Sequence, residues 1–111
     1  MVASVISTEA RAKYNGQSAH GDRDIYKGLS MWSPNINIFR DPRWGRGHET
    51  YGEDPYLTSR LGVRFIKGLQ GNGKYLKVAA CAKHFAVHSG PEAIRHSFDA
   101  VANPKDMNET Y

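Results

Sequence analysis

The sequence predicts an α/β fold in which strands alternate with helices. Three observations support this prediction: apolar stretches with strand character at 31–39 and 77–85, an amphipathic helix pattern between them at 55–70, and a second helix start at Asn103-Pro104. Parallel β-α-β units need neighbouring strands and helices, and 111 residues supply few of them. We therefore expect residues 1–111 to be a truncated piece of a larger α/β domain.

The N-terminal residues 2–14 are expected to form a helix, because apolar side chains recur there at helical spacing with charged side chains between them. Asn15-Gly16 is typical of a helix C-terminus. The polar, glycine-containing residues 15–30 that follow predict a loop.

A short strand is predicted within 31–39, best placed at 35–39. Ile36 and Ile38 alternate with polar residues there, which fits a strand with one buried face. The highly charged residues 40–54 then form a loop.

The clearest element is a helix over residues 55–70. Asp54 suits the N-cap position and Pro55 the first helical position, and Gly71 is typical of a helix end. Large apolar residues recur every four positions and give the helix one apolar face. These residues are Leu57, Leu61, Phe65 and Leu69.

A second strand is predicted over 77–85. Its small apolar residues run without interruption from Val78 to Ala82, as in a strand buried on both faces. Cys81, the only cysteine, lies in this run; it cannot form an internal disulfide, and we expect a buried, inert thiol.

The composition is that of an ordinary, mildly basic globular chain, with 40% hydrophobic residues and a net charge of +4. The basic residues are spread along the chain rather than clustered in a run, so no nucleic-acid partner is expected. No transmembrane run is present, and no membrane partner is expected. No signal peptide is visible, and the compartment stays open.

Two motifs suggest other chemistry but lack its context. Residues 68–74 have the spacing of a phosphate-binding loop, yet Tyr75 replaces the required Ser or Thr and the motif falls at a helix C-terminus, where the dipole repels anions. His84 and His88 are spaced like a helical metal pair, but His84 ends a strand. We expect neither a metal nor another cofactor.

Two polar clusters, residues 40–55 and 83–95, carry the candidate chemistry. Each follows a predicted strand, and in a parallel α/β barrel the strand ends point to one mouth. The donors are Arg46, Lys83, His84 and Arg95, with Glu49 and Glu92 among the acceptors. Interleaved donors and acceptors suit vicinal hydroxyls, because each hydroxyl both donates and accepts. The clusters together predict a polyol-binding pocket.

Not every charged residue of 40–55 is expected to contact a ligand. A salt-bridge web that fixes the loop is predicted for Arg40, Arg43, Glu49 and Glu53. Aromatic packing is the commoner role for Trp32, Trp44 and Tyr51, although their rings could also stack on a sugar face.

Several ordered motifs resemble the N-terminal barrel domain of glycoside hydrolase family 3, which includes β-glucosidases and β-xylosidases. They are Trp32-Ser-Pro-Asn-Ile-Asn-Ile-Phe-Arg-Asp-Pro-Arg-Trp-Gly-Arg46, Glu49-Thr-Tyr-Gly-Glu-Asp-Pro55, Gly68-Leu-Gln-Gly71 and Lys83-His-Phe85. The resemblance covers nearly the whole chain. It implies a partial (β/α)8 TIM-barrel segment, and residues 1–111 as an internal piece of the catalytic barrel domain.

The resemblance also implies roles. Arg46, Lys83, His84 and Arg95 would bind hydroxyls of the non-reducing-end sugar in the −1 subsite, with Glu49 and Glu92 in support. The implied reaction is retaining, exo-acting hydrolysis of a β-linked oligosaccharide or aryl glycoside. The nucleophile and the acid/base of this family lie outside the matched motifs, so no catalytic residue is expected in this chain.

The remaining expectations concern the chain as a whole. The rest of the barrel and a second domain are implied as partners, and the 111-residue chain alone is predicted to be inactive. Family members are cytoplasmic, periplasmic or secreted. A non-catalytic carbohydrate-binding module is the alternative function.

Overall fold

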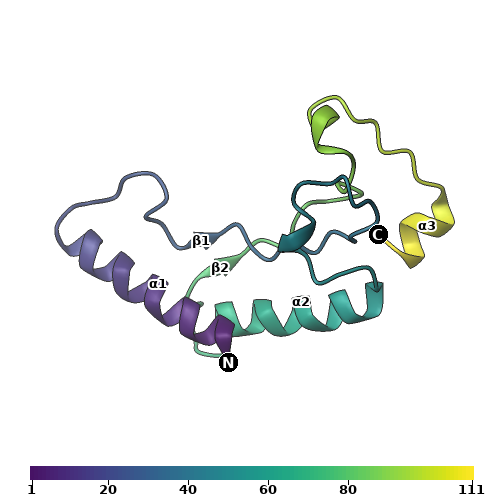
Figure 1. Cartoon of the computed structure of the whole chain (residues 1–111). Helices are drawn as coiled ribbons and strands as arrows, with labels where there is room; N and C mark the ends of the chain where they lie inside the picture. The colour runs from purple at the N-terminus through teal and green to yellow at the C-terminus, as the bar shows by residue number, and fades with distance from the viewer. The chain divides into compact units, whose positions relative to one another are not determined.

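The computed structural model describes all 111 residues, Met1–Tyr111. In chain order its elements are helix α1 (Val2–Ala19), strand β1 (Ser30–Met31), 3₁₀ helix η1 (Gly47–Glu49), helix α2 (Pro55–Gln70), strand β2 (Ala79–Ala80), 3₁₀ helix η2 (Glu92–Ile94) and helix α3 (Pro104–Glu109) (Figure 1). The chain forms two compact units, residues 1–34 with 63–81 and residues 35–62 with 82–111. None of the helices combines the length and the apolar character that a membrane crossing needs.

The first unit contains a parallel pair of strands, β1 and β2, with α2 between them in the chain. This arrangement confirms the predicted strand–helix–strand order. The register pairs Ser30 with Ala79 and Met31 with Ala80. Strand β2 lies inside the predicted range 77–85 but is only two residues long. The first strand was predicted at the wrong place: β1 is Ser30–Met31, and the predicted strand at 35–39 has only an isolated bridge at Asn35.

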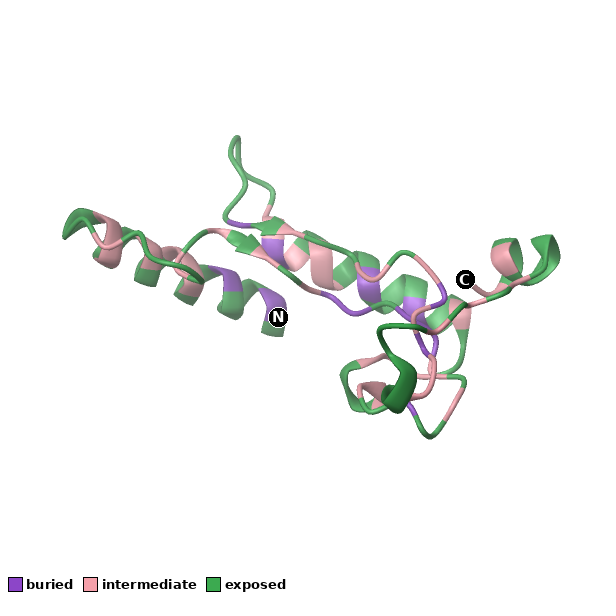
Figure 2. Cartoon of the chain, turned by 90° about the horizontal axis from the view of Figure 1, so that it is seen from above, coloured by how far each residue is buried: buried purple, intermediate pink, exposed green.

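The core of the first unit lies where α1 meets the last turn of α2. Ala3, Leu69 and Val78 are its buried apolar residues. Figure 2 shows buried positions, in purple, near the N-terminal end of α1. Gly68 permits the close approach, because a Cβ at this position would lie 2.7 Å from the Cβ of Ala3. The fully buried hydroxyl of Ser7 donates to the carbonyl of Gly68 at 3.1 Å and so fixes the same contact.

The predicted end of α1 at Asn15-Gly16 is wrong, because the helix continues to Ala19. Glycine inside a helix costs only about 1 kcal/mol relative to alanine, so it weakens the helix without ending it. The chain leaves the helix at Gly21, whose φ of +75° is the left-handed conformation typical of a helix end. The first residues of the predicted 15–30 loop are therefore helical.

Helix α2 spans Pro55–Gln70, as predicted. The carboxylate of Asp54 accepts a hydrogen bond from the N–H of Leu57 at 2.6 Å, which confirms the N-cap. Gly71 ends the helix with a φ of +71°. The predicted apolar face is buried only at its C-terminal end, since Leu69 is 1% exposed and Leu57 is 48% exposed.

Replacing Asp54 with Ala is expected to lower the free energy of unfolding by about 1 kcal/mol, because the N–H of Leu57 loses its acceptor. Urea denaturation measures this loss. Glu53→Ala is the matched control, since Glu53 is an exposed neighbouring carboxylate that takes part in no ion pair. Equal losses in the two variants would contradict the capping role.

Cys81 is exposed, so the prediction of a buried thiol is wrong. The residue directly follows β2, and its N–H donates to the carbonyl of Met31 at 3.0 Å. The core covers the side of the strand that carries Val78, whereas Ala79 and Cys81 lie exposed on the other side. An apolar run of this kind indicates burial on both faces, but here only one face is covered.

The segment 35–39 in the second unit buries its polar face. Ile38 is 6% exposed, as predicted, but Ile36 is 39% exposed, whereas Asn35 and Asn37 are 6% exposed each. The amides are hydrogen-bonded, as buried polar groups must be; the side-chain oxygen of Asn35, for example, accepts the N–H of Asn37 at 3.1 Å. The segment is therefore not a strand with one buried apolar face, because Asn37 and Ile38 are both buried and Ile36 is not.

Candidate substrate-binding site

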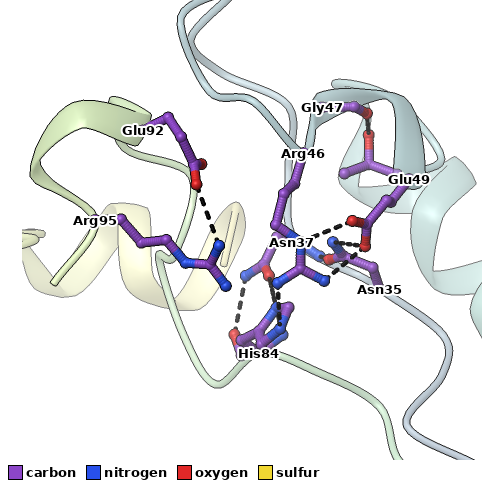
Figure 3. Close-up of polar contacts among 9 residues, drawn as sticks. Asn35, Asn37, Arg46, Gly47, Glu49, His84, Glu92 and Arg95 are labelled. Atoms are coloured by element: carbon purple, nitrogen blue, oxygen red, sulfur yellow. Dashed lines mark hydrogen bonds and ion pairs between the residues drawn. The ribbon is translucent and has the colours of Figure 1, made fainter.

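The two polar clusters of the sequence meet in the second unit. Lys83 forms an isolated parallel bridge with Asn35, and the N–H of Ile36 donates to the carbonyl of Lys83 at 2.8 Å. This pairing places the segment before the first polar cluster beside the start of the second. Figure 3 shows side chains from both clusters close together. The guanidinium of Arg46 contacts the ring of His84, so the two clusters lie against each other.

The side chain of Arg46 is the centre of this site. Its Nε and Nη2 groups donate to the two carboxylate oxygens of Glu49, each at 2.7 Å, and its Nη1 group lies 3.1 Å from Nε2 of His84 (Figure 3). Glu49 belongs to η1, so a single helical turn places both partners of the ion pair. Arginine has five N–H donors; with three engaged, two remain for a ligand.

The charge of this ion pair is fixed across ordinary pH. The hydrogen bonds from Arg46 lower the pKa of the Glu49 carboxyl to about 2, although partial burial acts in the opposite direction. The amide of Asn35 approaches the same carboxylate at 3.4 Å, and the charge of Lys83 acts on it as well. Glu49 therefore remains an anion that holds the guanidinium in one orientation.

Asn37 holds His84 on the opposite side from Arg46. The side-chain oxygen of Asn37 accepts from the backbone N–H of His84 at 2.9 Å and lies 2.8 Å from its Nδ1, while the side-chain NH₂ donates to the His84 carbonyl at 2.9 Å. An amide oxygen can only accept, so Nδ1 of His84 carries the proton. Nε2 is then the acceptor for the N–H of Arg46.

His84 is a neutral ring in this site. Burial lowers its pKa to about 4, and the positive charges of Arg46, His88 and Lys83 act in the same direction. A protonated ring would point an N–H at the guanidinium, which the geometry disfavours. Both ring nitrogens therefore already have protein partners.

Glu92 and Arg95 form a separate ion pair in and beside η2, with Nη1 of Arg95 donating to Oε1 of Glu92 at 3.1 Å (Figure 3). Both side chains are partly exposed. The Glu92 side chain lies against Gly45, where a Cβ would be 3.2 Å from its Cγ. Its charge reaches Arg46 and raises the pKa of that guanidinium together with the stronger contribution of Glu49.

Aromatic rings back the site behind His84. The ring centroids of His84 and His88 are 4.6 Å apart, and the ring of Trp44 meets His88 edge-on at 6.2 Å. Trp44 is 4% exposed, which confirms its packing role, whereas Trp32 is 71% exposed and is not packed as expected. Burial also lowers the pKa of His88.

The predicted salt-bridge web among Arg40, Arg43, Glu49 and Glu53 is wrong. Arg43 pairs with Asp41 at 2.8 Å instead, Glu49 pairs with Arg46, and Glu53 takes part in no ion pair. The turns of this loop bring together charged residues two or three positions apart, so Arg43 pairs with Asp41 and Arg46 pairs with Glu49.

Arg40 fixes the loop through different contacts. Its Nε group donates to the buried hydroxyl of Ser89 at 3.1 Å, and its guanidinium lies 5.8 Å from the ring centroid of Phe98 and 5.5 Å from that of Tyr111. The loop is therefore tied to later parts of the second unit by hydrogen bonding and cation–π contact.

The six predicted site residues thus fall into three groups. Arg46, Glu49 and His84 form one network, Glu92 and Arg95 form a pair, and Lys83 lies half-buried where its charge acts on Glu49. The sequence prediction missed Asn35 and Asn37. Their signal is the polar half of the alternation at 35–38, immediately before the charged loop.

The chain is an α/β protein in which paired parallel segments bring a neutral histidine, His84, against an arginine, Arg46, that a carboxylate holds in place. The family model described as "Glycosyl hydrolase family 3 N terminal domain" matches residues 11–108. The chain belongs to this family of glycoside hydrolases.

Its relatives include β-xylosidases. The chain is 55% identical to the xylan 1,4-β-xylosidase of Xylanibacter ruminicola over 96% of its length, and 49% identical to β-D-xylosidase 3 of Arabidopsis thaliana over 99%. It spans only 13% and 14% of those proteins. A solved GH3 exo-β-xylosidase (XlnD), in complex with a xylobiose aziridine activity-based probe, matches 86% of the chain with a TM-score of 0.69 and 40% identity, over 12% of that structure.

Proposed function

We propose that residues 1–111 are an internal segment of the N-terminal (β/α)8 barrel of a retaining, exo-acting β-xylosidase, and that they supply part of its −1 subsite. The relatives named as β-xylosidases support this choice over a β-glucosidase. The substrate would be a β-linked xylo-oligosaccharide or an aryl β-xyloside.

Exposed apolar side chains support the barrel assignment. Leu57 and Leu61 on α2 are 48% and 39% exposed, and Phe85 beside the site is 97% exposed. Parallel strands joined by a crossover helix are also the repeating unit of such a barrel, which needs about 250 residues to close, and this supports the proposal. Neighbouring strands and helices of the barrel would cover these side chains.

The Arg46 network is the observation that carries the proposal. Glu49 and His84 orient the guanidinium and leave two N–H groups for sugar hydroxyls. Lys83 and Arg95 would add further donors at the same mouth. With both ring nitrogens of His84 engaged, its contribution in this geometry is to hold Arg46.

In the proposed reaction, this segment binds and the rest of the barrel reacts. A carboxylate from outside the segment would attack the anomeric carbon, and a second acidic group would protonate the leaving oxygen. Hydrogen bonds from Arg46 and its neighbours to sugar hydroxyls would strengthen as the ring distorts, and would lower the barrier for that reason.

Full-length protein that contains this segment is expected to release xylose from nitrophenyl β-xyloside, with the β-anomer as the first product seen by NMR. Faster turnover of the matching β-glucoside would overturn the choice of sugar. Release of the α-anomer first would overturn the retaining mechanism.

The 111-residue chain alone is expected to show no turnover of the same substrates, because the proposed nucleophile and acid lie outside it. The assay uses the purified chain beside the full-length protein at equal molar concentration. Measurable hydrolysis by the chain alone would contradict the assignment of the catalytic carboxylates.

A further inference from the structure

Asn37 makes an unusual set of contacts for an asparagine outside the predicted site. It is 6% exposed, and both ends of its amide are used on one residue, His84. Two of the three contacts are to the backbone and resemble a strand pairing. The third, at 2.8 Å to Nδ1, has no counterpart in a strand and acts on the ring alone (Figure 3).

We propose that Asn37 is a positioning residue, which holds His84 as the neutral Nδ1–H tautomer so that Nε2 accepts a hydrogen bond from Arg46. This inference rests on the proposed function for its link to substrate. Glu49 fixes two N–H donors of the Arg46 guanidinium directly, and Asn37 fixes the third donor indirectly, through His84.

The choice of amide over carboxylate at position 37 matters because of the charges around the ring. Arg46 and Glu49 face His84 from the first loop, and Lys83 and His88 from its own segment. Three of these four are cationic when protonated, and they disfavour an imidazolium. A carboxylate at position 37 would accept the same Nδ1–H but would favour the charged ring, whose Nε2–H would then face Arg46.

The variant Asn37→Asp in the full-length protein tests the proposal. An adjacent opposite charge moves a pKa by about 1–3 units, so the acid limb of the kcat/KM profile on nitrophenyl β-xyloside is expected to move up by about that much. The loss of activity should be smallest at alkaline pH, where the ring is neutral and only the donor to the His84 carbonyl is missing. A uniform loss at every pH, with the limb unmoved, would show that Asn37 only braces the backbone.

Thermal unfolding provides a readout that does not need activity. In the wild type the pKa of His84 is lowered, so the stability it contributes is lost as the pH falls below about 6.5 towards 4. In Asn37→Asp this loss should shrink, and the deficit in melting temperature against wild type should be smaller at pH 5.5 than at pH 8. A constant deficit would overturn the inference, even if the protein proves not to be a xylosidase.

If Asn37→Asp does not fold, a double-mutant cycle that combines Asn37→Ser with His84→Gln tests the same proposal. Glutamine has no Nδ1–H for residue 37 to hold. The fall in kcat/KM caused by Asn37→Ser should therefore be clearly smaller in the His84→Gln background than in the wild type. Equal fold-losses in both backgrounds would show that Asn37 does not act through the ring.

Discussion

Replacing Arg46 with Lys is expected to lower kcat/KM of the full-length protein on nitrophenyl β-xyloside by about 10²- to 10³-fold. Hydrogen bonds to charged groups contribute about 1.5–3 kcal/mol each, and 1.4 kcal/mol is tenfold. An ammonium cannot engage both oxygens of Glu49, reach Nε2 of His84 and still present two donors to a sugar. The loss should therefore exceed that of a single contact, although the positive charge is kept.

Arg43→Lys is the matched control for this variant. Arg43 lies in the same loop, but its side chain is 75% exposed and pairs only with Asp41. Exposed ion pairs contribute little, so its kcat/KM should stay within about twofold of the wild type. Similar losses in the two variants would point to a general effect of loop charge and would contradict the proposed role of Arg46.

The elements that the sequence predicted best are those fixed by neighbouring residues. The caps of α2 at Asp54 and Gly71 were predictable because the side chain or the backbone acts within one turn. The start of α3 is equally local, since the side-chain oxygen of Asn103 accepts the N–H of Asp106 at 2.9 Å. The end of α1 depended instead on which of several glycines takes the left-handed conformation, and Gly16 does not.

The proximity of the two polar clusters was predictable, but the pairing of their charged side chains was not. Charge density marked both loops, and the parallel strand order placed them together. Arg46 is held by Glu49 because η1 forms between them. A single helical turn is too short to be predicted from a periodic sequence pattern. Asn37 was missed because an alternating segment has two faces, and only the packing of the folded unit decides that the amides are buried.

Glu49→Gln is the variant with the second largest expected effect. It keeps the size of the side chain but removes the charge that holds the guanidinium of Arg46 at two points. A neutral amide offers one acceptor oxygen in place of two, so Arg46 should lose its fixed orientation. We expect kcat/KM on nitrophenyl β-xyloside to fall by about 10- to 100-fold, on the basis of 1.5–3 kcal/mol for a charged hydrogen bond.

The same variant has a pH signature in the free energy of unfolding. The pKa of Glu49 is lowered from 4.5 to about 2, so its stabilisation is fully present above pH 4.5 and is lost as the pH falls towards 2. The difference in stability between wild type and Glu49→Gln should be constant above about pH 5.5 and shrink below pH 4.5. Glu53→Gln, which removes an exposed carboxylate without an ion pair, is the matched control. If denaturation gave parallel curves for Glu49→Gln and wild type down to pH 3, the carboxylate would not be the group that holds Arg46, and the site would have to be oriented by His84 and Asn37 alone.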